Sequence, residues 1–422
     1  MDLLLNTVQP YAWGSTTAIP ELMGVAPTGE PQAELWMGAH PAAPSRVVRD
    51  GGTLPLDRVI AADPARELGP AGLRRFGPRL PFLLKLLAAD APLSLQVHPD
   101  LAQAAAGFAV ENAMGVPLDA PHRNYRDGNH KPEMIVALTP FEGLCGFRTP
   151  RRCADLLDRL EVPGLRPFAA TLRGARDDEA ALREVFTAFL SPPPGLVAEV
   201  AGALARQAVR EAERDGPHRR DLGAFLAVAR AHPGDPGLLP ALMLRHFVLA
   251  PGQALYLGAG VPHAYLSGLG VEVMAGSDNV LRCGLTDKHV DRDELLKVVR
   301  FSALPTAPLA PRADGDGDGD GDGDGDEHVY PAPVDDFRLS RIELGAPARS
   351  LSRPRPLDSG APQIVLCTRG GARLTSAGAT LRIGPGQAVY VPAWERVGVS
   401  GEGTLFRATA GVPGDPRNRA GH

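Results

Sequence analysis

The chain has 422 residues, which at about 100–200 residues per domain indicates two or three domains and excludes a single small module. Its 44% apolar residues can form large cores, and its 48 glycines and 42 prolines favour turn-rich β structure over long helical bundles. The net charge of -5 comes mainly from one run, because residues 314–327 carry eight acids and no base. The remainder is near neutral, so we expect no nucleic-acid partner.

Membrane association and export are not expected either. No apolar run reaches the roughly 18 residues of a membrane span, and the first residues lack the basic start of a signal peptide. We therefore expect a cytoplasmic protein. Its four cysteines lie too far apart for a C-x-x-C motif, so we expect buried, reduced thiols: Cys145, Cys153, Cys283 and Cys367.

The pattern of apolar residues divides most of the chain into three regions. Residues 1–150 consist of short apolar stretches with period-2 alternation, which predicts strands. Residues 151–246 carry leucine, valine and phenylalanine at spacings of three and four, which predicts a helical domain. Strands return at 247–312, with one short helix at 291–299 that opens with an Asp-x-x-Glu cap.

An acidic low-complexity segment separates this part from the C-terminal one. Residues 313–328 contain alternating Asp and Gly and are predicted to form a flexible linker; calcium binding by the acidic turns is the alternative. Residues 329–422 form the last predicted domain. The chain is thus predicted to be mainly β with an α-helical insertion.

An internal repeat relates the two β regions. Residues 251–257 (PGQALYL) return 134 positions later as residues 385–391 (PGQAVYV), each reading as a turn followed by a strand. Two such units predict two cupin-type jelly-roll barrels. In this alignment His263 corresponds to Val397, and no histidine occurs from 330 to 420, so the second barrel is not expected to hold a histidine-bound metal.

Polar residues gather in three blocks of the first β region. Strict alternation in residues 93–98 (LSLQVH) places Ser94, Gln96 and His98 on one face of a strand. A second block places Lys131 and Glu133 on one face, and a third places His263 after a turn shaped by Gly and Pro. Each residue alone is more simply a hydrogen-bonded strand residue, but imidazole, carboxylate and amide together suit a divalent cation such as zinc.

Two further observations point to the same region. The chain has 40 arginines and only four lysines, and Lys85, Lys131 and Lys288 lie inside or beside the polar segments. Residues 272–288 carry Glu272, Asp278, Arg282 and Lys288 among small or apolar neighbours; a paired network that merely ties strands together is the alternative to a functional site.

Six ordered motifs together resemble the type I mannose-6-phosphate isomerases, zinc enzymes of the cupin superfamily. The resemblance spans most of the chain and is carried by residues 11–15 (YAWGS), 33–38 (AELWMG), 80–85 (LPFLLK), 96–100 (QVHPD), 129–133 (NHKPE) and 262–288. It departs from the family pattern at residues 286–288, where TDK stands in place of the usual TPK.

The resemblance implies a zinc-dependent isomerase that interconverts mannose 6-phosphate and fructose 6-phosphate through a cis-enediol, with one zinc ion per chain. It implies a catalytic barrel interrupted by the helical domain and followed by a degenerate copy. The implied zinc ligands are Gln96, His98, Glu133 and His263, and Arg282 is the implied active-site arginine.

The remaining roles are hypotheses from the residues themselves. Glu272, Asp278 and Lys131 are candidates for the group that moves the proton. Lys85, Ser94, Lys288 and Trp13 are candidates for contacts with the phosphorylated hexose.

Three other functions remain open: an isomerase of another aldose, a metal-dependent cupin dioxygenase and a non-catalytic sugar-binding cupin. We expect a monomer.

Overall fold

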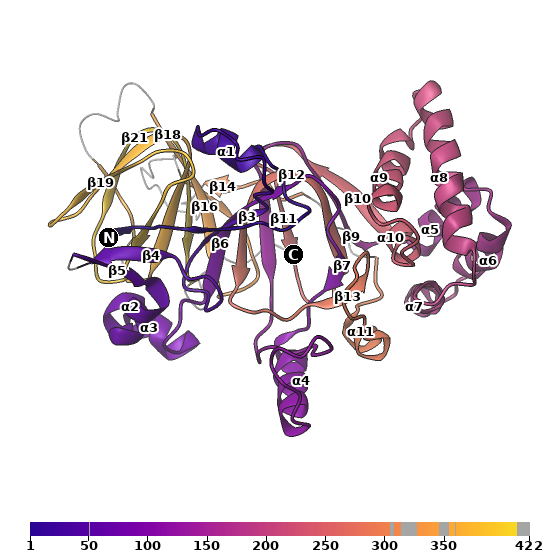
Figure 1. The fold of residues 1–422 in the computed structure, drawn as a ribbon, viewed down its shortest axis with the longest axis horizontal. Coiled ribbons are helices and arrows are strands. Elements are labelled where there is room, and N and C mark those ends of the chain that lie inside the picture. Colours follow the sequence, from indigo (N-terminus) through magenta and orange to yellow (C-terminus); the bar gives the residue numbers. More distant parts are fainter. Residues whose placement is uncertain (50, 304–307, 314–326, 346–353, 359, 412–422) are drawn as a thin grey trace.

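The computed structural model describes residues 1–49, 51–303, 308–313, 327–345, 354–358 and 360–411. Three parts follow one another along its longest axis: a C-terminal sheet, a central sheet and a helical block (Figure 1). The predicted Asp-Gly linker lies almost entirely outside the described residues. Among the described helices, none combines the length and the apolar character that crossing a membrane requires.

The central sheet has ten strands and contains the polar blocks. Its strands are β2 (Thr7–Gln9), β3 (Glu34–Met37), β6 (Phe82–Ala89), β7 (Leu95–Val97), β8 (Glu133–Ala137), β9 (Phe141–Phe147), β10 (Leu244–Leu249), β11 (Ala254–Leu257), β12 (His263–Ala275) and β13 (Leu281–Gly284). The helical block interrupts this sheet in the sequence, between β9 and β10, yet these two strands pair with each other.

The longest strand of the central sheet, β12, changes neighbours along its length. Its first residues pair with β7 and β9, and its second half pairs with β6 and β8. The change occurs at Gly268, whose φ of +119° and close approach to Pro140 leave no room for a side chain. This strand therefore connects all the strands that carry the polar blocks.

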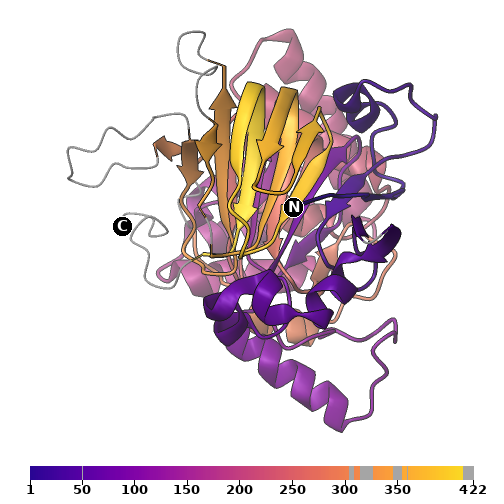
Figure 2. The same ribbon diagram turned by 90° about the vertical axis from the view of Figure 1, so that its left-hand side faces the viewer.

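In the part of the chain that the structure describes, the C-terminal sheet has nine strands and includes the start of the chain. Its strands are β1 (Asp2–Leu3), β14 (Arg312–Ala313), β15 (Glu327–Tyr330), β16 (Arg338–Leu344), β17 (Arg355–Pro356), β18 (Gln363–Thr375), β19 (Thr380–Ile383), β20 (Ala388–Val391) and β21 (Gly398–Thr409). β1 pairs with β20, so the N-terminus lies against the C-terminal sheet (Figure 2). A separate hairpin is formed by β4 (Arg46–Arg49) and β5 (Gly52–Pro55).

The two large sheets share one hydrophobic core. Alternation along β12 directs Val271 and Val273 into a cluster that also contains Leu339, Ile364 and Phe406 of the C-terminal sheet. The same alternation directs Glu272 to the opposite face. The central sheet thus buries one face against its neighbour, and its other face carries the polar side chains beside smaller apolar clusters.

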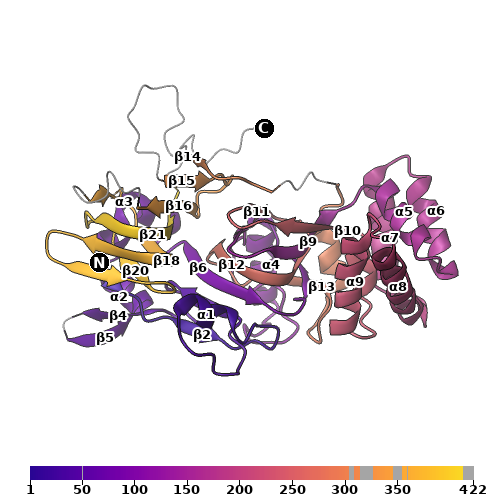
Figure 3. The ribbon, with the colours of Figure 1, turned by 90° about the horizontal axis from the view of Figure 1, so that it is seen from above.

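The helical block lies at the other end of the molecule, and its core continues into strands β7, β9, β12 and β13 of the central sheet (Figures 1 and 3). Its helices are α5 (Pro150–Arg159), η1 (Pro163–Leu165), α6 (Arg166–Arg173), α7 (Asp178–Phe189), α8 (Leu196–Glu213), α9 (Arg219–Ala231) and α10 (Leu238–Leu242). Thr149 and Asp177 cap α5 and α7, and the helices bury the leucines, valines and phenylalanines that predicted them. The predicted α-helical insertion is confirmed.

Five further helices lie within the β regions: α1 (Ala18–Met23), α2 (Leu56–Ala62), α3 (Pro64–Phe76), α4 (Leu101–Ala113) and α11 (Arg292–Val298). The helix predicted at 291–299 is confirmed as α11, with Asp291 as its cap. The first four were not predicted. For α4 the signal was a capping box, in which Asp100 and Gln103 bond each other's backbone, but its run of alanines gives little amphipathic pattern.

The prediction of a mainly β chain with a helical insertion is therefore confirmed. The strand pairings of the described residues leave both large sheets open, so the two predicted jelly-roll units are seen as open sheets and not as closed barrels. The four cysteines are buried and free, as expected.

Candidate active site

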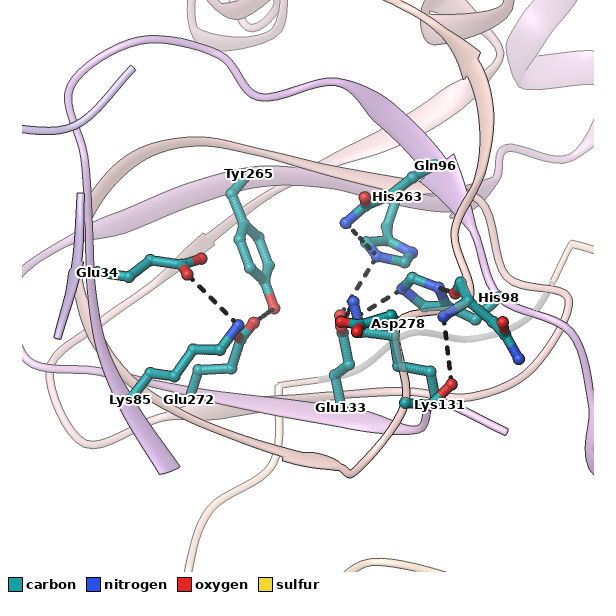
Figure 4. Close-up of polar contacts among 12 residues, drawn as sticks. Glu34, Lys85, Gln96, His98, Lys131, Glu133, His263, Tyr265, Glu272 and Asp278 are labelled. Atoms are coloured by element: carbon teal, nitrogen blue, oxygen red, sulfur yellow. Dashed lines mark hydrogen bonds and ion pairs between the residues drawn. The ribbon is translucent and has the colours of Figure 1, made fainter. Parts of the chain in front are cut away.

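The four predicted metal ligands meet at one end of the central sheet (Figure 4). Gln96 lies in the middle of β7 and His98 directly follows this strand, while Glu133 and His263 are the first residues of β8 and β12. His263 lies opposite Gln96 in the antiparallel pairing of β12 with β7. Three of the four side chains are almost completely buried: His98, Glu133 and His263.

The donor atoms of this group are spaced for one metal ion. His98 Nε2 lies 3.4 Å from Glu133 Oε1, and His263 Nε2 lies 3.5 Å from Glu133 Oε2. The ligand atoms of the three residues all lie within 4.8 Å of one another. The Gln96 amide lies 3.3 Å from His263 Nε2, so a rotation of this amide would present its oxygen to the same point.

Backbone carbonyls fix the orientation of both histidines. Nδ1 of His98 lies 2.8 Å from the carbonyl of Asn279, and Nδ1 of His263 lies 2.9 Å from that of Val261. A carbonyl only accepts hydrogen bonds, so both Nδ1 atoms carry the proton and both Nε2 lone pairs face Glu133. Burial also lowers the pKa of His98 to about 4, which keeps this imidazole neutral.

Two buried polar atoms of this group lack a hydrogen-bond partner. They are His98 Nε2 and Glu133 Oε2. Burial opposes the ionisation of Glu133, but the positive charge of Lys131 helps to hold the pKa of this carboxyl well below its usual value. Two imidazoles, a carboxylate and an amide whose rotation would bring its oxygen to the same point fit a zinc ion in chemistry and in number.

A buried chain of charges runs beside the ligand group. Lys85 Nζ on β6 lies 3.1 Å from Glu272 on β12 and 3.6 Å from Glu34 on β3. Tyr265 donates to the other oxygen of Glu272 at 3.0 Å, and Trp36 donates to Glu34 at 2.5 Å. Burial alone would lower the pKa of Lys85, but the two carboxylates raise it, so this lysine stays charged. Both oxygens of Glu272 are occupied within this chain.

Two more predicted residues lie at the rim. Lys131 Nζ is 3.3 Å from Glu133 Oε1. Asp278 Oδ1 is 3.2 Å from His40 Nε2, and 51% of the Asp278 side chain is exposed. The hydrogen bond with His40 holds the pKa of Asp278 below its usual value. Asp278 therefore combines negative charge with access to solvent.

Arg282 and Lys288 belong to a group of cations. Arg282 lies opposite Gln96 in the pairing of β13 with β7. Burial lowers the pKa of Arg282 and Arg126 lowers it further; burial, Arg282 and Arg126 together lower the pKa of Lys288. Asp287 is the acid that acts on both. The sequence analysis missed Arg126, because one arginine among 40 carries no distinguishing signal.

The last two predicted residues, Trp13 and Ser94, lie near the ligand group. Trp13 stacks on Tyr11 with ring centroids 5.7 Å apart and packs against the apolar cluster of the central sheet. Ser94 is half-buried, two residues before Gln96. Their proposed contacts with a substrate stay predictions.

Comparison with known proteins agrees with this arrangement. Residues 1–150 match the family model "Phosphomannose isomerase type I, catalytic domain". The chain is 40% identical over 410 residues to the mannose-6-phosphate isomerase of Escherichia coli, covering 96% of this chain and 99% of that protein. This chain belongs to the mannose-6-phosphate isomerase family. The bovine member (Bos taurus) is 31% identical over 414 residues, covering 92% of this chain and 93% of that protein.

Solved structures of the mannose-6-phosphate isomerase family have the same fold. A variant of the phosphomannose isomerase from Salmonella typhimurium superposes with a TM-score of 0.86 at 36% identity, over 97% of this chain and 99% of that chain. A mannose 6-phosphate isomerase bound with zinc and yttrium superposes with a TM-score of 0.85 over the same shares. The resemblance seen in the sequence is confirmed, as is the prediction that the chain is an enzyme of this family.

Proposed function

We propose that this protein interconverts mannose 6-phosphate and fructose 6-phosphate with one zinc ion per chain. The observation that carries the proposal is the buried His98, Glu133 and His263 group, in a chain whose relatives are mannose-6-phosphate isomerases along nearly their whole length. A relative solved with zinc supports the choice of metal.

Gln96, His98, Glu133 and His263 would hold the ion. Bound there, zinc supplies Lewis-acid polarisation of the sugar oxygens at C1 and C2 and stabilises the negative charge that develops on them. Glu133 is the one carboxylate among the four ligands, so the loaded site keeps a net positive charge.

Arg126, Arg282 and Lys288 would bind the phosphate. Arg126 lowers the pKa of Arg282, and both arginines lower that of Lys288, so positive charge gathers here beside a single acid, Asp287. A phosphate group supplies the missing negative charge and accepts several hydrogen bonds. Lys85 was a candidate for this role, but it is 6% exposed and held by two carboxylates, so we assign it to the electrostatics of the site.

Asp278 is the best placed of the three candidates to move the proton between C1 and C2. Both oxygens of Glu272 are engaged by Lys85 and Tyr265. Lys131 is engaged by Glu133. Asp278 is ionised, half exposed and held by one histidine from the side, so it can accept a proton from a bound sugar without breaking a buried ion pair.

A coupled assay of mannose 6-phosphate conversion tests the proposal, run on purified protein before and after chelation and after zinc is returned. We expect activity that chelation removes and zinc restores. A zinc-loaded protein that leaves mannose 6-phosphate unchanged would refute it. Turnover of another aldose, or sugar binding without turnover, would then identify one of the remaining classes.

A further inference from the structure

Two loops that are far apart in the sequence interlock behind His98. One comprises residues 126–129 and the other residues 277–279. Four residues, Asp127, Asn129, Ser277 and Asn279, make the contacts between them and are called the inter-loop cluster here. The Asn279 side chain is completely buried at its centre.

Asn279 uses every hydrogen-bonding site of its amide. Nδ2 donates to the carbonyls of Asp127 at 2.7 Å and Asn129 at 2.8 Å. Oδ1 accepts from the backbone N–H of Arg126 at 2.7 Å and of Asp127 at 3.3 Å. An aspartate would lose both donations and place negative charge against two carbonyls, so the site demands an amide.

Asp127 holds the second loop from the opposite direction. Its Oδ1 accepts from the Ser277 hydroxyl at 2.9 Å, and its Oδ2 accepts from the backbone N–H of Asp278 at 2.8 Å. The same Ser277 hydroxyl lies 3.1 Å from the carbonyl of Asn129, so its one proton can be donated to either acceptor. Each loop therefore satisfies the backbone of the other.

The cluster touches each part of the proposed site. The carbonyl of Asn279 accepts from Nδ1 of the ligand His98 at 2.8 Å. The backbone of Asp278, the proposed proton carrier, is held by Asp127. The backbone of Arg126, one of the three cations, is held by Asn279.

We propose that Asn279 and Asp127 are positioning residues that set the metal ligand His98, the acid Asp278 and the cation Arg126 in one geometry. For Asp278 and Arg126 this inference rests on the proposed function; for His98 it concerns metal affinity alone. Partners that orient a ligating histidine contribute about 10- to 100-fold to metal affinity.

The test compares variants with a control that removes a buried amide elsewhere. Asn279→Ala and Asp127→Asn remove contacts of the cluster. Gln363→Ala removes an amide that is 2% exposed in the C-terminal sheet. The zinc dissociation constant is measured by competition with a chromogenic chelator, the thermal midpoint with and without zinc, and kcat and KM for mannose 6-phosphate.

We expect Asn279→Ala and Asp127→Asn to weaken zinc binding by about tenfold or more and to raise KM. Gln363→Ala is expected to lower the thermal midpoint and leave the zinc dissociation constant and KM unchanged. Should Asn279→Ala fail to fold, Asp127→Asn decides, because it keeps the side-chain volume and one acceptor oxygen.

Two results would overturn the inference: zinc affinity unchanged in the folded variants, or a parent protein that binds no zinc. The inference and the proposed function fail separately. A parent protein that binds zinc but does not convert mannose 6-phosphate refutes the function, while the zinc titrations still decide whether the cluster positions His98.

Discussion

The central and C-terminal sheets repeat one arrangement of strands with different residues inside. In the central sheet β11 pairs with β8, and in the C-terminal sheet β20 pairs with β18, with the repeated sequence on β11 and β20. Leu257 faces Glu133 in the first pair, and the equivalent Val391 faces Gln363 in the second. Gln363 thus takes the place of Glu133, and Val397 that of His263.

The equivalence extends to the buried charges. Glu272 lies opposite Lys85 in the central sheet, and Arg407 lies opposite Ser340 at the corresponding place. The same pairings relate Glu34 to Glu327, which faces Ile342 as Glu34 faces Leu87. The chain Glu34, Lys85 and Glu272 therefore corresponds to Glu327, Ser340 and Arg407.

The two interiors satisfy their polar groups in different ways. Arg407 lies 3.2 Å from Glu327, both 2% exposed, so the C-terminal sheet neutralises its charges internally. Buried polar atoms without a hydrogen-bond partner occur in both sheets: His98 Nε2 and Glu133 Oε2 in the central one, Gln363 Oε1 and Arg407 Nε in the C-terminal one. The comparison teaches that both interiors pair buried charges, Arg407 with Glu327 and Lys85 with Glu272. Among the described residues, the central sheet alone adds a His-Glu-His group that could hold a metal ion.

The largest effect is expected when His263 of the central sheet is replaced by valine, the residue at the equivalent position 397 of the C-terminal sheet. His263→Val should remove a zinc ligand, and with it several kcal/mol of transition-state stabilisation, so kcat should fall about 10³-fold or more. Zinc content and the coupled assay measure this. The reverse change, Val397→His, should bind no zinc, because Gln363 occupies the place of Glu133; zinc uptake by that variant would contradict the comparison.

Breaking the internal ion pair of the C-terminal sheet should cost stability without affecting chemistry. Arg407→Met leaves Glu327 buried beside one cation fewer and should lower the free energy of unfolding by about 3–5 kcal/mol. Urea denaturation measures this loss, and kcat of the folded fraction should be unchanged. A variant with native stability would show that the pair is not what holds this interior.

Asp278 and Glu272 should have different roles: Asp278 moves the proton, and Glu272 acts through its charge. Asp278→Asn should lower kcat about 10²–10⁴-fold, the usual contribution of a positioned acid or base. Glu272→Gln should act less on kcat and more on stability, because it weakens the hold on Lys85. If both variants keep near-native turnover, neither carboxylate moves the proton.

The junction between the central sheet and the helical block should respond to pH. His246 on β10 is buried and lies 3.2 Å from Asp221 on α9 and 3.4 Å from Glu142 on β9; Arg148 pairs with Asp221, and Arg220 acts on Glu142. Burial alone would lower the pKa of His246, but the two carboxylates raise it above 6.5. The stabilisation should therefore be complete below pH 6.5 and be lost as pH rises through the raised pKa.

Urea denaturation at several pH values checks this dependence, with His246→Gln as the comparison. The parent protein should lose its stability advantage over the variant as pH rises above 6.5, while kcat of the folded protein stays the same. A difference that does not vary with pH would show that His246 contributes through packing alone.

The smallest effect is expected where the C-terminal sheet approaches the site. Asp336 lies 2.9 Å from Nε2 of His130, which directly precedes Lys131. Asp336→Asn should raise KM severalfold and leave zinc affinity unchanged, because the amide oxygen can still accept the hydrogen bond from His130 but carries no charge. Asp335→Asn is the control, since Asp335 faces Arg75 at 3.7 Å. Equal KM values for the two variants would show that the C-terminal sheet does not contribute to substrate binding.

Much of the site could be predicted from local pattern. Alternation in residues 93–98 placed Gln96 and His98 on one face, and the spacing of Lys131 and Glu133 anticipated their contact at 3.3 Å. The repeat aligned Val397 with His263, one of the four predicted metal ligands. The helical block followed from its apolar spacing, whereas α2, α3 and α4 escaped detection because proline, glycine and alanine blur their periodicity.

The sequence by itself determined which residue types were present, which face of each strand they occupy and which family the chain resembles. Only the tertiary structure decided the partners: His40 for Asp278, Glu34 for Lys85, Arg126 beside Arg282, and Asn279 behind His98. The physical reason is the separation along the sequence over which each signal acts. Apolar periodicity and helix capping depend on a few neighbouring residues. These contacts join segments up to 238 positions apart and depend on how the strands pair.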